Sequence, residues 1–177
     1  IRSHRLTPRE RDAEHWPWPV RIRTLGRFEV SVDGVPLRFD GKAQHKPLEL
    51  LKLLVIAGER RVAVDRLIEQ LWPSAEVGGR KAFDITVHRL RKLLGSDNAV
   101  EVADRSAALD SKQVWVDLWA AERLLEPLQT RAPGSAEAAR LAEGAPRVLD
   151  LLRGPLLPGD ADSAWLLPAR HRLTTRV

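Results

Sequence analysis

Lysine and arginine side chains are concentrated in one short segment of this 177-residue chain, residues 80–92. The segment carries five of these cations and one histidine, against a single acid, Asp84. Long cationic side chains donate hydrogen bonds to phosphate oxygens and, in the major groove of DNA, to base edges. Ordinary surface helices intersperse acids and bases four residues apart, and this segment does not. The segment therefore predicts a binding surface for a polyanion.

A helix over residues 80–94, ended by Gly95, would separate these charges from an apolar side. At about 100° per residue, four apolar residues form one stripe. They are Phe83, Val87, Leu90 and Leu94. The opposite side carries Lys81, Ile85, His88, Arg89 and Lys92. Two further cations flank the stripe, Arg80 and Arg91. One side can thus join a core while the other enters the major groove, where Ile85 is a candidate for contact with a thymine methyl group.

The preceding residues predict the elements that would position this helix. A change to a period of two predicts a strand with a bulge over residues 20–32. Asp33-Gly34 predicts a hairpin turn into a second strand, 35–39. Residues 44–57 then read as a helix with an apolar face.

A helix-turn-helix is predicted next. A short β segment over residues 61–64 precedes a helix over 66–72, for which Asp65 is a natural N-cap. Residues 74–79 form a loop into the cationic helix.

Two alternating segments, residues 100–102 and 114–116, predict the strands of a second hairpin. The residues between them, 104–106 and 109–112, are turn formers, and Arg105 lies near the tip. A hairpin in this place is a wing suited to the neighbouring minor groove. The order of elements predicts an α+β fold, a winged helix-turn-helix with an N-terminal β-hairpin and a C-terminal wing.

A small α-helical region is predicted to follow. Asp117 is placed to cap a helix over residues 118–125, and two more helical stretches are predicted over 136–152 and 164–174. The chain is accordingly divided into a linker, a winged-helix DNA-binding domain and a helical region: residues 1–19, 20–116 and 117–177.

Charge and composition agree with this division. The formal charge of +5 lies entirely before residue 117, where 21 Lys and Arg face 16 Asp and Glu, whereas eight of each sign follow. The chain has no cysteine, and no apolar run approaches the roughly 20 residues of a membrane span. We therefore expect a cytoplasmic protein without membrane contact. Because the chain starts at Ile1 and has no Met, we also expect it to be an excerpt of a longer polypeptide.

No enzyme, cofactor or metal site is predicted. Gly34 and Gly41-Lys42-Ala43 only superficially suggest a phosphate loop, because six residues separate the glycines and Ala43 has no hydroxyl for magnesium. The five histidines include no pair four residues apart, so no metal site is indicated.

Several motifs resemble the OmpR/PhoB-type winged helix, and more narrowly the version in Streptomyces antibiotic regulatory proteins and large multidomain bacterial activators. They are Leu25-Gly26-Arg27-Phe28, Gly41-Lys42-Ala43-Gln44, the helix 46–54, the segment 67–73 and the segment 87–94. The tail 152–159 resembles the opening of a bacterial transcriptional activator domain. Together with the lead-in 16–19, it makes the chain similar to the C-terminal part of a large MalT-like regulator.

The resemblance implies that the helix 80–94 enters the major groove and that the wing touches the minor groove. It places Lys81, His88, Arg89 and Arg91 at positions that contact DNA in the family. His88 stands where the family often has arginine, and the activator domain looks shorter than in family members. The resemblance leaves open contact with RNA polymerase and formation of a homodimer.

The leading prediction is sequence-specific binding of double-stranded DNA by the output domain of a bacterial transcriptional regulator. The candidate DNA-binding residues are Arg80, Lys81, Ile85, His88, Arg89, Arg91, Lys92 and Arg105. Two alternatives remain: a winged-helix module that binds an acidic protein partner, and a helical module whose role is dimerisation through the residues after Asp117.

Overall fold

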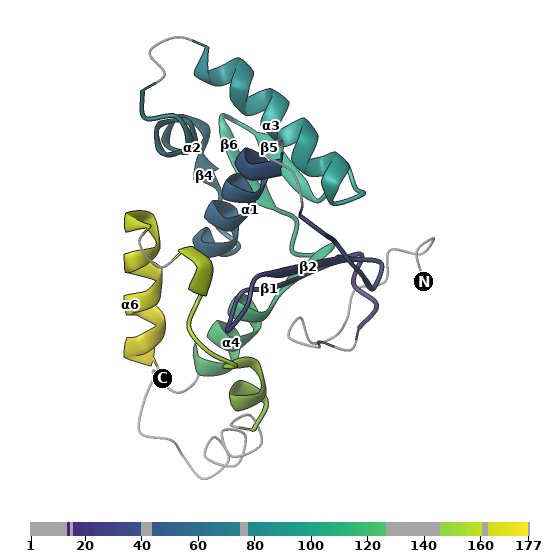
Figure 1. Ribbon diagram of the computed structural model, residues 1–177, viewed down its shortest axis with the longest axis vertical. Coiled ribbons are helices and arrows are strands. Elements are labelled where there is room, and N and C mark those ends of the chain that lie inside the picture. The colour runs from purple at the N-terminus through teal and green to yellow at the C-terminus, as the bar shows by residue number, and fades with distance from the viewer. Residues whose placement is uncertain are drawn as a thin grey trace. The chain divides into compact units, whose positions relative to one another are not determined.

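The computed structural model describes residues 14, 16–39, 44–74, 78–126, 146–160 and 163–176. Their contacts divide the chain into two compact units (Figure 1). One unit comprises the described residues of Trp18–Arg21 and Ser31–Val114, and the other those of Ile1–Pro17, Ile22–Val30 and Trp115–Val177. Within the described ranges, no helix is long and apolar enough to cross a membrane.

Three strands near the N-terminus and one later strand form a four-stranded sheet in the order β3-β2-β1-β7. The strands are β1 Val20–Arg23, β2 Glu29–Val32, β3 Val35–Pro36 and β7 Val114–Val116. The expectation of a single bulged strand over residues 20–32 is wrong, because residues 24–28 interrupt it and β1 and β2 are neighbours in the sheet. Gly26 has a φ of 81° in this connection, a conformation that glycine adopts without a Cβ clash.

The predicted turn at Asp33-Gly34 is confirmed. Both residues have positive φ, 51° and 82°, as the two central positions of a type I′ turn require. The turn pairs Val32 with Val35 in the antiparallel β2–β3 ladder. The second strand ends at Pro36, earlier than the predicted Phe39.

Three helices pack against one another in the unit that holds residues 31–114 (Figure 1). They are α1 His45–Ala57, α2 Val64–Leu71 and α3 Gly79–Leu93. The short strand β4, Val62–Ala63, precedes α2. The prediction that Asp65 is the N-cap of α2 is wrong. The N-cap is Ala63, and Asp65 lies in the first turn of the helix.

The wing is a hairpin of β5 Val100–Ala103 and β6 Ser106–Leu109, which β4 extends to a three-stranded sheet in the order β4-β6-β5. The prediction that residues 114–116 are the hairpin partner of β5 is wrong. Residues 114–116 do form a strand, but as β7 they join the other sheet, and the partner of β5 is the segment between them. The tip with Arg105 is present, because Asp104 and Arg105 form the two-residue turn between β5 and β6.

The residues after β7 are helical where they are described. They form α4 Asp117–Leu125, helical residues 146–151, the 3-10 turns Pro158–Asp160 and Ala164–Leu166, and α6 Leu167–Arg176. Residues 136–145 of the second predicted helix lie outside the described residues. The third predicted helical stretch is confirmed as the turn Ala164–Leu166 followed by α6.

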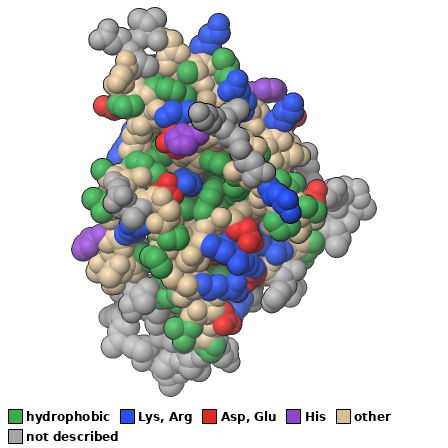
Figure 2. Space-filling model, viewed as in Figure 1, with side chains coloured by type: hydrophobic (Ala, Val, Ile, Leu, Met, Phe, Trp, Pro, Cys, Tyr) green, Lys and Arg blue, Asp and Glu red, His purple; other side chains and the backbone are tan. Residues whose placement is uncertain are grey.

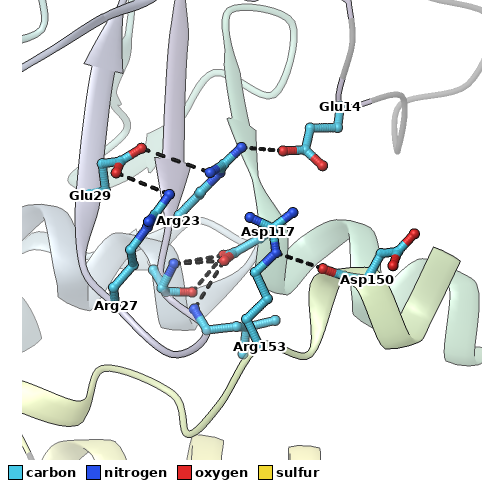
Figure 3. Close-up of polar contacts among 9 residues, drawn as sticks. Glu14, Arg23, Arg27, Glu29, Asp117, Asp150 and Arg153 are labelled. Atoms are coloured by element: carbon cyan, nitrogen blue, oxygen red, sulfur yellow. Dashed lines mark hydrogen bonds and ion pairs between the residues drawn. The ribbon is translucent and has the colours of Figure 1, made fainter.

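A buried carboxylate, Asp117, joins the start of α4 to the β1–β2 connection (Figure 3). Its oxygens accept hydrogen bonds from the Thr24 amide at 2.8 and 2.9 Å, the Thr24 hydroxyl at 2.7 Å and the Leu25 amide at 2.9 Å. The prediction that Asp117 is the N-cap of α4 is wrong: the N-cap is Val116, and Asp117 is the first residue of the helix. Burial raises the pKa of the Asp117 carboxyl above its ordinary value, although the hydrogen bonds from Leu25, Thr24 and Leu118 act to lower it.

Two glycines allow the segment after residue 152 to reach the same connection. A Cβ on Gly26 would lie 2.7 Å from the Arg153 carbonyl oxygen, and one on Gly154 would lie 2.9 Å from the Gly26 Cα atom. The Gly26 amide donates to the Pro155 carbonyl at 2.9 Å. The backbones therefore meet at a separation that only glycine permits at both positions.

We expect Leu90→Ala to lower the free energy of unfolding by about 2–5 kcal/mol, because Leu90 is completely buried in α3 and its truncation leaves a cavity. Ile85→Ala on the same helix is the matched control, since Ile85 is 43% exposed; it should cost about 0.5 kcal/mol or less. Urea unfolding of both variants measures the difference. Equal losses would mean that α3 does not bury the stripe that contains Leu90.

Candidate nucleic-acid interface

The apolar stripe predicted on α3 is buried. Phe83, Val87, Leu90 and Leu94 are each at most 4% exposed, and α3 packs on α1 and α2. On α1, Leu50, Leu51 and Leu54 are likewise buried. This packing fixes the rotation of α3 about its own axis and so decides which residues face solvent.

The side of α3 away from the core is exposed and cationic. Lys81, Ile85, His88, Arg89 and Lys92 are all exposed. They lie at spacings of three, four and seven residues and therefore share one face of the helix. Lys, Arg and His side chains project in Figure 2 from the region that α3 occupies in Figure 1. The structure thus brings these five predicted site residues together on one surface.

The one acid on this helix is paired with the first cation. Arg80 Nε lies 3.3 Å from a carboxylate oxygen of Asp84, four residues later. Among the described residues no ion pair is found for Lys81, Arg89 or Lys92. Within the described residues, the charges of Lys81, Arg89 and Lys92 are therefore left uncompensated.

Arg91 is placed differently from the other candidates. Its Nε and Nη2 donate to the Val100 carbonyl at 3.0 and 2.6 Å, and it is only partly exposed. Arg91 thereby attaches the first residue of β5 to α3. Contact with DNA stays a prediction for Arg91, and its guanidinium has a structural role that the sequence did not reveal.

A close approach between α2 and α3 sets the geometry of the helix-turn-helix. Gly79, the first residue of α3, is buried, and a Cβ there would lie 2.5 Å from Ile68 Cγ2. Gly78 before it is in the left-handed region, with a φ of 89°. Lys46 of α1 donates to the Leu71 carbonyl at 2.7 Å, at the C-terminal end of α2.

The predicted wing residue, Arg105, lies at the tip of the β5–β6 hairpin with a φ of 57°. Its side chain is 78% exposed, and its Nη2 donates to Asp65 Oδ2 at 2.8 Å. Arg61 supports the same hairpin, because it donates to the Ser106 hydroxyl at 2.9 Å and to Glu101 Oε2 at 3.0 Å. The contacts of Asp65 and Arg61 with the wing were not predicted, because their partners lie about 40 residues away and leave no local signal.

A cavity of about 220 Å³ lies in the other unit. Three arginines line it, but Arg23 pairs with Glu14 and Arg27 with Glu29, and Arg153 Nε donates to the Asp150 carbonyl (Figure 3). Its charges are largely satisfied within the protein. No group of three His, Cys, Asp or Glu side chains suited to a metal ion occurs among the described residues.

The comparisons agree with the winged-helix geometry. Residues 41–104 match the family described as transcriptional regulatory protein, C terminal. Over this segment the chain is similar to that family, and the structure there has the winged-helix fold. The family comprises DNA-binding domains and is not a family of enzymes. The predicted fold is confirmed, and so is the resemblance to the OmpR/PhoB-type domain over this segment.

A solved structure is similar over most of the chain. It is EmbR of Mycobacterium tuberculosis in complex with a low affinity phosphopeptide, with a TM-score of 0.67 and 24% sequence identity. The similarity covers 90% of this chain and 43% of EmbR, so the chain spans less than half the length of that protein. At this identity the likeness shows the fold alone. No curated protein sequence matches the chain.

We expect Gly79→Ala to destabilise the domain by about 1–3 kcal/mol, because the added methyl group overlaps the branched part of Ile68. Chemical unfolding measures the loss. Ile68→Ala in the Gly79→Ala background should recover part of it, since it removes the overlapping atom. If Gly79→Ala is neutral or stabilising, the contact between α2 and α3 is not as close as described.

Proposed function

We propose that the chain binds double-stranded DNA sequence-specifically as the output domain of a bacterial transcriptional regulator. In this proposal the exposed side of α3 enters the major groove and the β5–β6 wing lies at the minor groove. The observation that carries it is the arrangement of α3, with its apolar side buried and its exposed side cationic. The match of residues 41–104 to a transcriptional regulatory family supports the same function.

The dimensions of α3 suit this role. Fifteen residues give a helix of about 22 Å, and a helix with its side chains is about as wide as the major groove. Arg89 is exposed near the middle of the helix, and its planar guanidinium can bond bidentately to guanine. Ile85, 43% exposed, offers an apolar contact for a thymine methyl group.

The first turn of α3 has another role in this proposal. Its unpaired amide groups and the positive end of the helix dipole favour a phosphate, and Arg80 adds a cation there. Lys81, His88 and Lys92 supply further contacts along the helix, and Arg91 and Arg105 would contact the backbone or the minor groove from the helix end and the wing. Such contacts position the protein and carry little sequence information.

Several wider features stay predictions. They are action in the cytoplasm, contact with RNA polymerase, homodimer formation, the three domain ranges and the likeness to large MalT-like regulators.

Duplex binding should weaken steeply with salt. About 4–6 phosphate contacts by a monomer predict a slope near −4 to −5 in a plot of log K against log salt concentration. Fluorescence anisotropy with a labelled mixed-sequence duplex measures this slope. An affinity that is insensitive to salt, or no binding at low salt, would contradict DNA binding and favour an interaction module for another partner.

Arg89→Ala should cost about 1–3 kcal/mol on the preferred site, obtained by selection from random duplexes, and should flatten the preference at one base pair. Arg80→Ala should weaken binding to all sequences alike, because it removes a phosphate contact and also leaves Asp84 unpaired beside the DNA. Affinities for the selected site and for a scrambled duplex distinguish the two effects.

Arg172→Ala provides the control for net charge, since Arg172 is an exposed cation of α6, outside the candidate interface. It should change both affinities only slightly. If Arg89→Ala lowers the affinity for the selected and scrambled duplexes by the same factor, Arg89 contacts phosphate and the assignment of base readout is wrong.

A further inference from the structure

The wing tip contacts the first turn of α2 through both the backbone and the side chain of Arg105. The Val64 amide donates to the Arg105 carbonyl at 2.9 Å. The guanidinium of Arg105 donates to Asp65 Oδ2 at 2.8 Å. The residue that sequence analysis assigns to the minor groove is therefore paired with an acid of the same domain.

The two contacts differ in how easily they can be broken. The backbone contact continues the β4–β6 ladder, in which Ala63 pairs with Ser106 and Val62 with Ala107, so the tip is held beside α2. The side-chain contact lies in solvent, with Arg105 78% and Asp65 69% exposed. Exposed ion pairs are weak and screened by salt. The guanidinium can therefore change partner while the tip stays in place.

A nucleic acid would compete with Asp65 for this guanidinium. Phosphate oxygens and the acceptors on the minor-groove floor can accept hydrogen bonds from the same guanidinium that now donates to Asp65. Asp65 is also the only acid in the first turn of α2, so its charge repels a phosphate that approaches Arg105. Loss of the ion pair and repulsion of the phosphate both oppose binding.

We propose that Asp65 restrains DNA binding by holding the wing arginine, which must exchange Asp65 for DNA when the wing docks. The inference rests on the proposed function and assigns a regulatory residue to the same interface. The restraint acts on every duplex. It matters most for non-specific DNA, where binding is essentially electrostatic and no base contacts compensate for the lost pair.

The test measures binding of the 177-residue chain to a labelled mixed-sequence duplex at about 50 mM salt, where electrostatic binding is strong. Asp65→Asn should tighten binding about two- to fivefold, the range expected when an exposed ion pair no longer competes. Glu69→Gln is the matched control: Glu69 is an exposed acid of the same helix, for which no ion pair is found among the described residues. It removes the same charge and should give a smaller gain.

The double variant decides the mechanism. In an Arg105→Gln background, Asp65→Asn should give no more than the gain of Glu69→Gln, because no guanidinium remains to be released. A gain that persists undiminished in this background assigns the effect to net charge and overturns the inference. Weaker binding by Asp65→Asn also overturns it, since the pair would then preorganise the wing.

The wild-type measurement separates the two proposals. If the wild-type chain binds duplex DNA and Asp65→Asn leaves its affinity unchanged, only the role of Asp65 is refuted. If the wild-type chain binds no duplex at low salt, the proposed function and the role of Asp65 fail together. Circular dichroism of each variant confirms that its helices are intact.

Discussion

Burial of one apolar stripe on α3 decides what this helix can bind. Phe83 and Leu90 are completely buried, so α3 has a single allowed rotation against α1. A rotation that exposed them would also bring Arg89 toward the core, and burying an unpaired cation is far more costly than burying an apolar side chain. The cationic face therefore follows from packing. Any partner of α3 meets several arginine and lysine side chains around Ile85. These side chains project from one face of the helix because the opposite face is packed in the core.

The two helices of the helix-turn-helix also hold the wing, one at each end of strand β5. At its start, the Val100 carbonyl accepts two hydrogen bonds from Arg91 of α3. At the tip, the carbonyl of Arg105 accepts from Val64 of α2. The wing is therefore held in position relative to α3 by contacts within the protein. In the proposed function, this lowers the conformational cost of contacting two grooves together. Arg91 therefore has a structural role in the wing in addition to the DNA contact proposed for it.

Local periodicity predicted the helices well and the wing strands poorly. The apolar stripe of α3 is visible in the sequence of this one helix. Its burial could therefore be predicted without knowing which elements pack against it. Strand pairing is different, because alternation at 100–102 and 114–116 identifies strands without naming their neighbours. The true partner, Ser106–Leu109, contains two alanines and has little β propensity. Its turn is Asp104-Arg105, without the glycine that usually marks a two-residue hairpin.

Asp65 and Asp117 gave the same sequence signal and have opposite environments. Both were predicted as N-caps, and both lie just inside the helix, where an acid favours the helix dipole equally well. Their carboxylates bind partners 40 and 93 residues away, which no local pattern reveals. Asp117 is 3% exposed, and its release would leave the amides of Thr24 and Leu25 buried without acceptors. Asp65 lies in solvent, where water or phosphate can replace it at small cost. Burial therefore makes Asp117 a permanent part of the fold and leaves Asp65 free to exchange its arginine with a ligand.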